Sequence, residues 1–213
     1  MKGIPLKTWE IRAILEDHKT VMRRVVKPQP EITPIPTFGG SYRVSMAENI
    51  FIKPPYYPGE ILYVKETWCV QSARRFDADA KIMFKAGGDM VRIKFPGGGT
   101  QYHSRREYDA FVARWADDRW HSSIHMPFEA ARIFLRVKSV RVERLQDILD
   151  GPPGPECQIV KEGCKYACDF PVMWDRAIKP ADRTLYGWEA SPWVWVIEFE
   201  RCEKPKEEGN GLG

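Results

Sequence analysis

The chain has 213 residues, of which 43% are hydrophobic and 12% aromatic, a composition that excludes a disordered protein. Charged residues make up 29% but the net charge is only +4, so binding of a polyanion would depend on a local site. The sequence has no run of 18 apolar residues and no apolar signal region, so we expect no membrane span and no secretion. An odd number of cysteines, five, favours a reducing, cytoplasmic setting.

The N-terminal 30 residues predict a helix that ends in a donor-rich turn. The helix should start at Thr8, and its apolar spacing predicts a buried face made of Trp9, Ile11, Ile14 and Leu15. The polar sequence His18-Lys19-Thr20 follows, then Arg23-Arg24 and an extended basic segment that ends at Pro30. Such a helix end is suited to bind an anion or the edge of a base.

Short strands dominate the rest of the chain. Residues 31–58 are rich in Pro and Gly and predict a connection with at most one short strand, around 42–44. The apolar run 61–64 predicts a buried strand that ends in Lys65-Glu66-Thr67-Trp68. Further strands are expected at 81–86 and 91–95, which form a hairpin about the turn 87–89, and at 133–142 and 193–200.

Few helices are expected after the first. The capping-box pattern that starts at Ser104 predicts a helix whose apolar face contains Tyr108, Phe111, Val112 and Trp115. Helical segments are also expected at 145–149 and, capped by Asp169, at 170–178. Short strands without regular βαβ alternation predict an α+β fold or a small mixed barrel. We expect one domain over 1–202 with insertions at about 31–53, 89–119 and 150–168, and a loose tail at 203–213.

Lys19 and Glu66 are the principal candidates for a functional pair. A buried Lys beside a carboxylate can act as a proton acceptor in catalysis. Together with the carboxylate it can instead form hydrogen bonds with the edge of a nucleobase. The alternative is that the two residues form a surface ion pair without a function. Trp68 either stacks on an unpaired base or packs in the core against the first helix. Arg23 and Arg24 are adjacent and should therefore point to opposite sides.

Two other sets of residues have polar chemistry. Ser123 and His125 precede a strand and are binding candidates, although no adjacent Asp orients the His and no nucleophile-elbow pattern is present. Cys157, Cys164 and Cys168 lack the spacing of a zinc site, so we expect no metal and no cofactor. Ordinary reduced cysteines are the simpler interpretation.

Four motifs, HKTVMRRVVKPQP, PGEILYVKETW, SSIHMP and PWVWVIEFE, resemble those of the ASCH domain proteins of the PUA-like superfamily, in particular the phage and prophage type. The resemblance implies a PUA-like mixed β-barrel with short helices and a cleft beside the first helix. In the family signature of a Gly, a Lys and an Arg, Lys19 and Arg24 match, while Asp17 stands in place of the Gly. By this match Arg24 is the arginine that faces the ligand.

The resemblance implies RNA, other single-stranded nucleic acid, or a modified nucleoside as the partner, in a bacterial host cell. Some members hydrolyse the acyl group on N4 of cytidine with a Lys, a Thr three residues later and a distant Glu. Lys19 and Glu66 match these, Met22 stands at the Thr position, and Thr20 is the nearest hydroxyl.

The first hypothesis is therefore a nucleic-acid or nucleotide-binding protein. The alternative is a hydrolase of an N4-acylated cytidine or RNA that uses Lys19, Glu66 and Thr20, and a phage assembly factor ranks last. The oligomeric state stays open.

Overall fold

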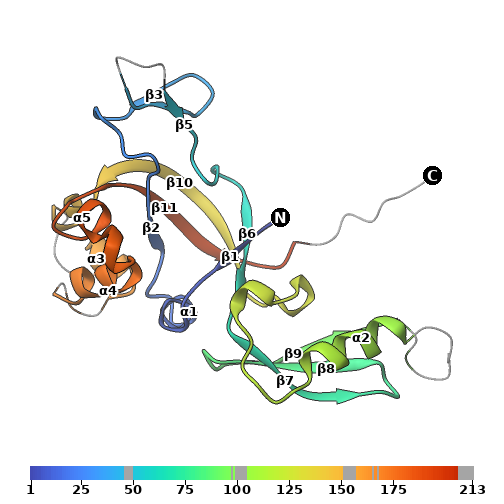
Figure 1. Ribbon diagram of the computed structural model, residues 1–213. Coiled ribbons are helices and arrows are strands. Elements are labelled where there is room, and N and C mark those ends of the chain that lie inside the picture. The colour runs from blue at the N-terminus through green and yellow to red at the C-terminus, as the bar shows by residue number, and fades with distance from the viewer. Residues whose placement is uncertain are drawn as a thin grey trace, which may run out of the picture. The chain divides into compact units, whose positions relative to one another are not determined.

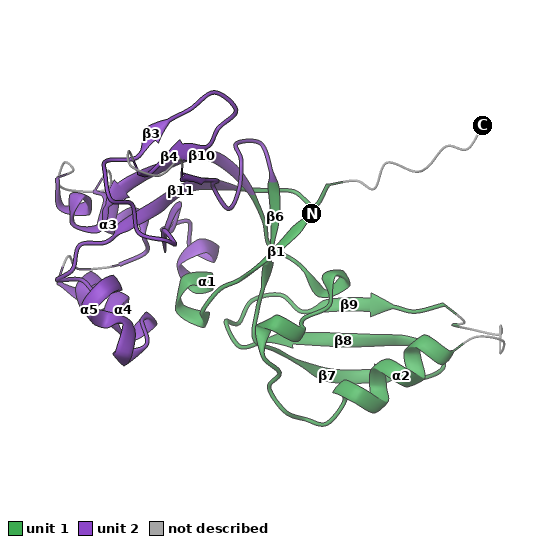
Figure 2. Cartoon of the chain, turned by 45° about the horizontal axis from the view of Figure 1, so that its top comes forward, with its two compact units in different colours: residues 1–12, 61–135, 201–213 green, residues 13–60, 136–200 purple. Residues whose placement is uncertain are grey.

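The computed structural model describes residues 1–45, 50–96, 98, 105–150, 157–164, 166 and 168–205 (Figure 1). The predicted cap Ser104 and parts of the predicted insertions and tail lie outside these residues. The chain divides into two compact units (Figure 2). Unit 1 comprises residues 1–12, 61–135 and 201–213, and unit 2 comprises 13–60 and 136–200. The expectation of a single domain over 1–202 stays a prediction.

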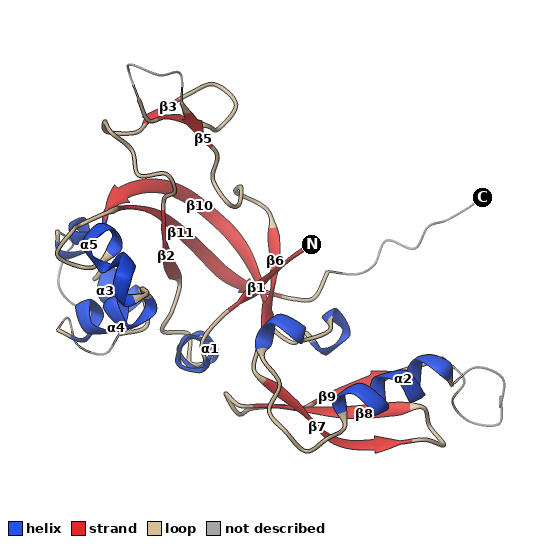
Figure 3. Ribbon diagram, viewed as in Figure 1, coloured by secondary structure: helices blue, strands red, loops and turns tan. Residues whose placement is uncertain are grey.

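The fold is mixed α+β, with short helices and mostly sheet, as predicted (Figure 3). The strands form one five-stranded sheet of order β1-β6-β10-β11-β2 and two three-stranded sheets, β3-β4-β5 and β7-β8-β9. Within the described part of the chain these sheets do not close into a barrel, so the PUA-like barrel stays a prediction. No helix among the described residues is long and apolar enough to cross a membrane.

Unit 1 contains a parallel strand pair and a separate antiparallel sheet. Its strands are β1 (Lys2–Pro5), β6 (Ile61–Lys65), β7 (Trp68–Arg74), β8 (Asp79–Phe84), β9 (Val91–Lys94) and the first residues of β10 (Phe134–Arg144). Its helices are most of α1 (Thr8–Leu15), α2 (Arg106–Trp115), η1 (Ser123–His125) and η2 (Phe128–Ala130). β1 pairs with β6 in parallel, with Ile4 opposite Val64.

The antiparallel sheet of unit 1 carries α2 on one face (Figures 1 and 3). The core between sheet and helix includes Trp68, Ile82, Phe84, Ile93 and Phe134. The predicted hairpin is confirmed by the antiparallel pairing of β8 and β9. The strand β7 was not predicted, because its register shifts between Val70 and Ser72 and this bulge interrupts the alternation of apolar residues.

Unit 2 contains the end of α1, the larger part of β10 and all but the last two residues of β11 (Trp193–Cys202). Its other strands and helices are β2 (Val21–Val25), β3 (Ile35–Pro36), β4 (Tyr42–Arg43), β5 (Phe51–Ile52), η3 (Leu145–Leu149), α3 (Gln158–Lys161), α4 (Asp169–Ala177), η4 (Pro180–Asp182) and α5 (Arg183–Tyr186). β2 pairs with β11 in antiparallel orientation, with Arg24 opposite Trp195. The core beneath α3 and α4 includes Val21, Ile159, Phe170 and Val194.

Two sequence predictions about helices need correction. Trp9 is 36% exposed, while Ile11 and Ile14 are buried, so the apolar face of α1 is narrower than predicted. α4 begins at Asp169 itself, with Cys168 as the preceding residue and no side-chain cap. Asp169 therefore lies in the first turn of the helix, where its negative charge is favourable, and does not cap it.

Candidate functional site

The turn that follows α1 positions Lys19 in unit 2. After Leu15 the chain reverses at Asp17, whose φ is +57°, and the N–H groups of His18 and Lys19 both donate to the carbonyl oxygen of Ala13. A positive φ favours Gly and is tolerated by Asp. Asp17 therefore adopts a backbone conformation that Gly would adopt without strain.

Lys19 is buried and bonded to a residue that sequence reasoning missed. Its Nζ donates to Oε2 of Glu162 at 2.6 Å and to the backbone oxygen of Glu162 at 2.8 Å. A β-bridge also joins the two residues. Glu162 lies in the predicted insertion 150–168, where no pattern marked it. Lys19 is 2% exposed, so these bonds are made away from water.

Arg23 extends this pairing into a balanced ionic network. Its Nη1 donates to Oε1 of Glu162 at 3.1 Å, and its Nη2 lies 3.6 Å from Oε2 of Glu143. Arg141 in turn pairs with Glu143 and Glu198. Burial raises the pKa of Glu198, but the hydrogen bonds from Arg141 and Ser139 together with the charges of Arg141 and Lys161 lower it overall. Among the described residues, Lys19, Arg23 and Arg141 thus pair with the three carboxylates of Glu162, Glu143 and Glu198.

Arg24 lies on the opposite side of β2 from Arg23, as predicted from their adjacency. Arg23 is buried and Arg24 is exposed. Lys27, three residues later, is also exposed, and its Nζ lies 4.6 Å from the ring centroid of Tyr186. Within the described ranges, neither Arg24 nor Lys27 lies within ion-pair distance of a carboxylate. These two cations are therefore available to an external anion.

Thr20 and Met22 occupy contrasting positions near Lys19. Thr20 is exposed. Its backbone N–H donates to the backbone oxygen of Lys161, and its backbone oxygen accepts from the N–H of Phe199. Met22 is 1% exposed and belongs to the core. Thr20 therefore carries the hydroxyl nearest to Lys19 in the sequence, and the side chain at position 22 is apolar.

Glu66, in unit 1, is held by a second residue that sequence reasoning missed. Arg132 donates from Nε to Oε1 at 2.9 Å and from Nη2 to Oε2 at 2.8 Å, and Glu66 is fully buried. Arg132 also donates to the backbone oxygens of Gly87 and Asp89, and its guanidinium lies 4.1 Å from the ring centroid of Phe84. Lys19 and Glu66 thus each have an ionic partner in their own unit, and their predicted pairing with one another stays a prediction.

Trp68 is a core residue, which corrects its proposed role as a stacking surface. Its side chain is fully buried, and its ring packs against Phe111, Trp115 and His121 with centroid separations of 6.1, 5.4 and 5.1 Å. The partner helix is α2 and not the first helix. In this position the ring has no exposed face for a base.

Ser123 and His125 lie on the turn η1 of unit 1. Ser123 is half-buried and His125 is exposed, with its ring 5.7 Å from that of Trp115. His121, near this turn, does have an acidic neighbour, because its Nε2 lies 3.1 Å from Oδ1 of Asp117 and 2.9 Å from the Trp115 oxygen. Ser123 and His125 therefore stay candidates for binding only.

The cysteines of the insertion do not gather around a common point. Cys164 is buried with its Sγ 3.7 Å from Sδ of Met173, while Cys168 is exposed beside Asp169. No group of three or more His, Cys, Asp or Glu side chains suited to a metal ion occurs in the described part of the chain.

Comparison with known proteins gives no relative: no family model, no curated protein and no solved structure matches the chain.

Proposed function

We propose that the protein binds single-stranded nucleic acid, or a nucleotide with a modified base, through the exposed side of the basic segment that follows α1. One observation carries this proposal: the cations of this segment differ in burial and in whether they pair with a carboxylate. Lys19 and Arg23 are buried and paired with Glu162, whereas Arg24 and Lys27 are exposed and have no carboxylate partner in the described part of the molecule.

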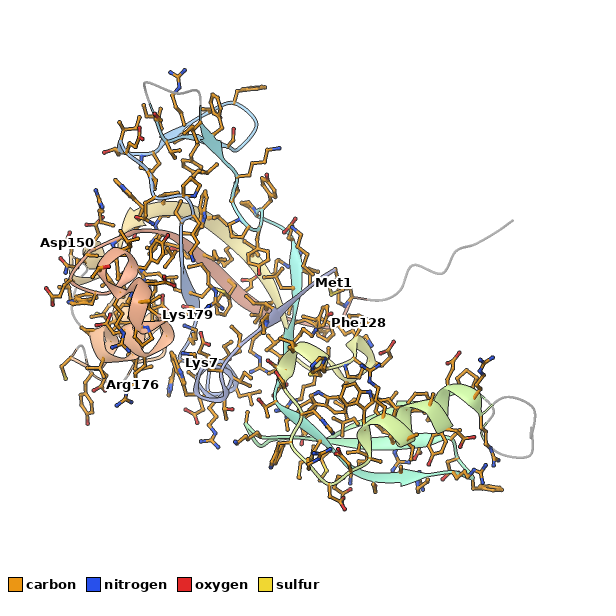
Figure 4. All side chains as sticks on the ribbon, viewed as in Figure 1. Met1, Lys7, Phe128, Asp150, Arg176 and Lys179 are labelled. Carbon is orange, nitrogen blue, oxygen red and sulfur yellow. The ribbon has the colours of Figure 1, made fainter. Side chains whose placement is uncertain are left out.

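The chemistry of the exposed side suits a single strand. Cations placed along a groove bind successive phosphates of a nucleic-acid strand. An aromatic ring beside them gives a surface on which a base can stack. Lys27 lies over Tyr186, which is half-buried on α5. Arg176 and Lys179, both exposed, extend from the same α4–α5 segment (Figure 4). The proposed surface thus combines exposed positive charge with a half-buried aromatic ring.

The resemblance to ASCH domain proteins supports the same class of ligand. It rests on the four sequence motifs, and the positive φ of Asp17 at the signature Gly position is consistent with it. We include in the proposal a PUA-like arrangement with its ligand beside the first helix. No observation favours hydrolysis, because both oxygens of Glu66 are bonded to Arg132, and the core residue Met22 takes the place of the catalytic Thr.

Fluorescence anisotropy with a labelled single strand of about 12 nucleotides tests the proposal. At about 0.05 M salt, Arg24→Ala/Lys27→Ala should weaken binding by roughly one to two orders of magnitude. The matched control is Arg136→Ala/Lys138→Ala, which removes two exposed cations that already pair with Glu200. Absence of binding to RNA, DNA and a panel of modified nucleosides would overturn the proposal, as would an equal loss in the control.

A further inference from the structure

Among the residues of unit 1 that the structure describes, α2 packs on one face of the sheet β7-β8-β9, and exposed strand residues lie on the other face. The pairing register assigns the faces, since residues directly opposite each other point to the same side. Ala80 lies opposite Ala73 and Ile93, and these belong to the face that packs with α2. The other face carries two rows of residues that lie opposite one another across β7, β8 and β9. One row is Ser72, Lys81 and Arg92, and the other is Arg74, Asp79 and Lys94.

This second face is strongly basic. Arg74, Arg92 and Lys94 are exposed, Lys81 is half-buried, and the exposed Lys85 follows directly after β8. The one acidic residue among the strand positions of this face is Asp79. It is 3% exposed and accepts hydrogen bonds from Arg74 at 3.1 and 2.6 Å and from Arg92 at 3.2 Å. Asp79 therefore holds two guanidinium groups side by side across the sheet.

Three of the five cations form no ion pair within the described part of the chain, although the charge of Lys94 acts on Asp79. Asp77, in the turn after β7, also pairs with Arg74 at 3.0 Å. Lys81, Lys85 and Lys94 have no carboxylate within ion-pair distance among the residues that the structure describes. Such a regular array of cations on a sheet is complementary to the regularly spaced phosphates of a nucleic-acid duplex.

The dimensions of the sheet select the kind of duplex. Neighbouring strands lie about 4.8 Å apart, so β8 and β9 form a two-stranded ribbon with Lys81 on one strand and Lys94 on the other. The major groove of B-form DNA is about 12 Å wide and admits a two-stranded β-ribbon, whereas the major groove of A-form RNA is too narrow for side chains to read. We infer that the ribbon β8-β9 binds double-helical DNA in the major groove, with Lys81, Lys85 and Lys94 on the flanking phosphates. The inference is independent of the proposed function, because it concerns other residues and another unit.

The test measures binding of labelled duplex DNA, duplex RNA and single-stranded RNA to the full chain. Lys81→Ala/Lys94→Ala should weaken binding of duplex DNA and lower the slope of log affinity against log salt by about 1.8, since two phosphate contacts are lost. Binding of single-stranded RNA should stay unchanged in this variant. The control Arg106→Ala/Arg114→Ala removes two exposed cations from α2, on the other side of the sheet, and should bind duplex DNA as the wild type does.

Several outcomes would overturn the inference. They are no binding of duplex DNA at low salt, an equal loss in the α2 control, and binding of duplex RNA as tight as that of duplex DNA. Binding to vesicles of anionic lipid in place of DNA would also contradict it. Thermal unfolding of each variant checks that the fold is kept, and Lys85→Ala/Lys94→Ala provides a second pair should the first fail to fold. Loss of single-strand binding alone would count against the proposed function and leave this inference standing.

Discussion

Lys19 donates two hydrogen bonds from its buried Nζ to Glu162, one to the side chain at 2.6 Å and one to the backbone at 2.8 Å. Together with the bond from the N–H of Thr20 to the Lys161 oxygen, this pairing fixes the chain between α1 and β2 against α3. The buried half of the basic segment therefore stabilises unit 2, whereas Arg24 and Lys27 in the exposed half have no carboxylate partner among the described residues.

Glu162→Gln should destabilise the protein strongly. Removal of one partner from a buried ion pair leaves an uncompensated charge and typically costs about 3–5 kcal/mol. We expect a loss of that order in the free energy of unfolding, measured by urea denaturation. Glu200→Gln is the control, because the side chain of Glu200 is half exposed and its ion pairs are long, so the change should be below about 1 kcal/mol. Similar losses in both variants would contradict a structural role for the Lys19–Glu162 pair.

Arg132→Lys should also destabilise, although it keeps the charge. A lysine cannot reproduce the two parallel bonds to Glu66 together with those to the Gly87 and Asp89 oxygens. Each lost bond to a charged group costs about 1.5–3 kcal/mol, and we expect a total loss within or above that range. Arg136→Lys, at an exposed position on β10, should change stability by less than about 0.5 kcal/mol. Equal stability of Arg132→Lys and the wild type would show that the bidentate geometry is unimportant.

The stability of the protein should depend on pH through Asp79. The hydrogen bond from Arg74, together with the charges of Arg92 and Lys94, holds the pKa of Asp79 below its ordinary value. A lowered pKa in the folded state contributes stability above the ordinary value, near pH 4, and this contribution is lost as the pH falls through the lowered pKa. Asp79→Asn should therefore lose less stability on acidification below about pH 4. Unfolding midpoints measured against pH check this, and parallel curves for the two proteins would refute it.

Trp68→Phe should leave binding of a single strand unchanged, because Trp68 is buried and has no exposed face. Trp68→Ala should lower the free energy of unfolding by about 3–5 kcal/mol, since it leaves a large cavity beneath α2. Anisotropy titration and urea denaturation give the two readouts. A weaker affinity of a normally folded Trp68→Phe variant would restore the stacking hypothesis.

Local patterns in the sequence predicted what depends on local geometry. The turn 87–89 correctly predicted the hairpin of β8 and β9. Because Arg23 and Arg24 are adjacent on an extended segment, they were correctly predicted to point to opposite sides. The strand β7 was not predicted because it contains a bulge. At the bulge two residues lie opposite one residue of β8, which interrupts the alternation of apolar side chains.

The ionic partners could not be predicted, because they are set by tertiary contacts. Glu162 lies 143 positions from Lys19 in a segment without periodicity. Arg132 directly precedes an alternating strand and had the pattern of a solvent-facing residue, yet its side chain is only 10% exposed beside Glu66. Trp68 at a strand end fitted both a surface and a core position, and only the placement of α2 distinguishes them.

The salt dependence of single-strand binding tests the central claim most directly. Titrations of labelled single-stranded RNA at several salt concentrations give the slope of log affinity against log salt for the wild type and for Arg24→Gln/Lys27→Gln. The loss of two phosphate contacts should reduce the magnitude of that slope by about 1.4. An unchanged slope, or the same reduction in Arg136→Gln/Lys138→Gln, would contradict the assignment of the exposed basic segment as the binding surface.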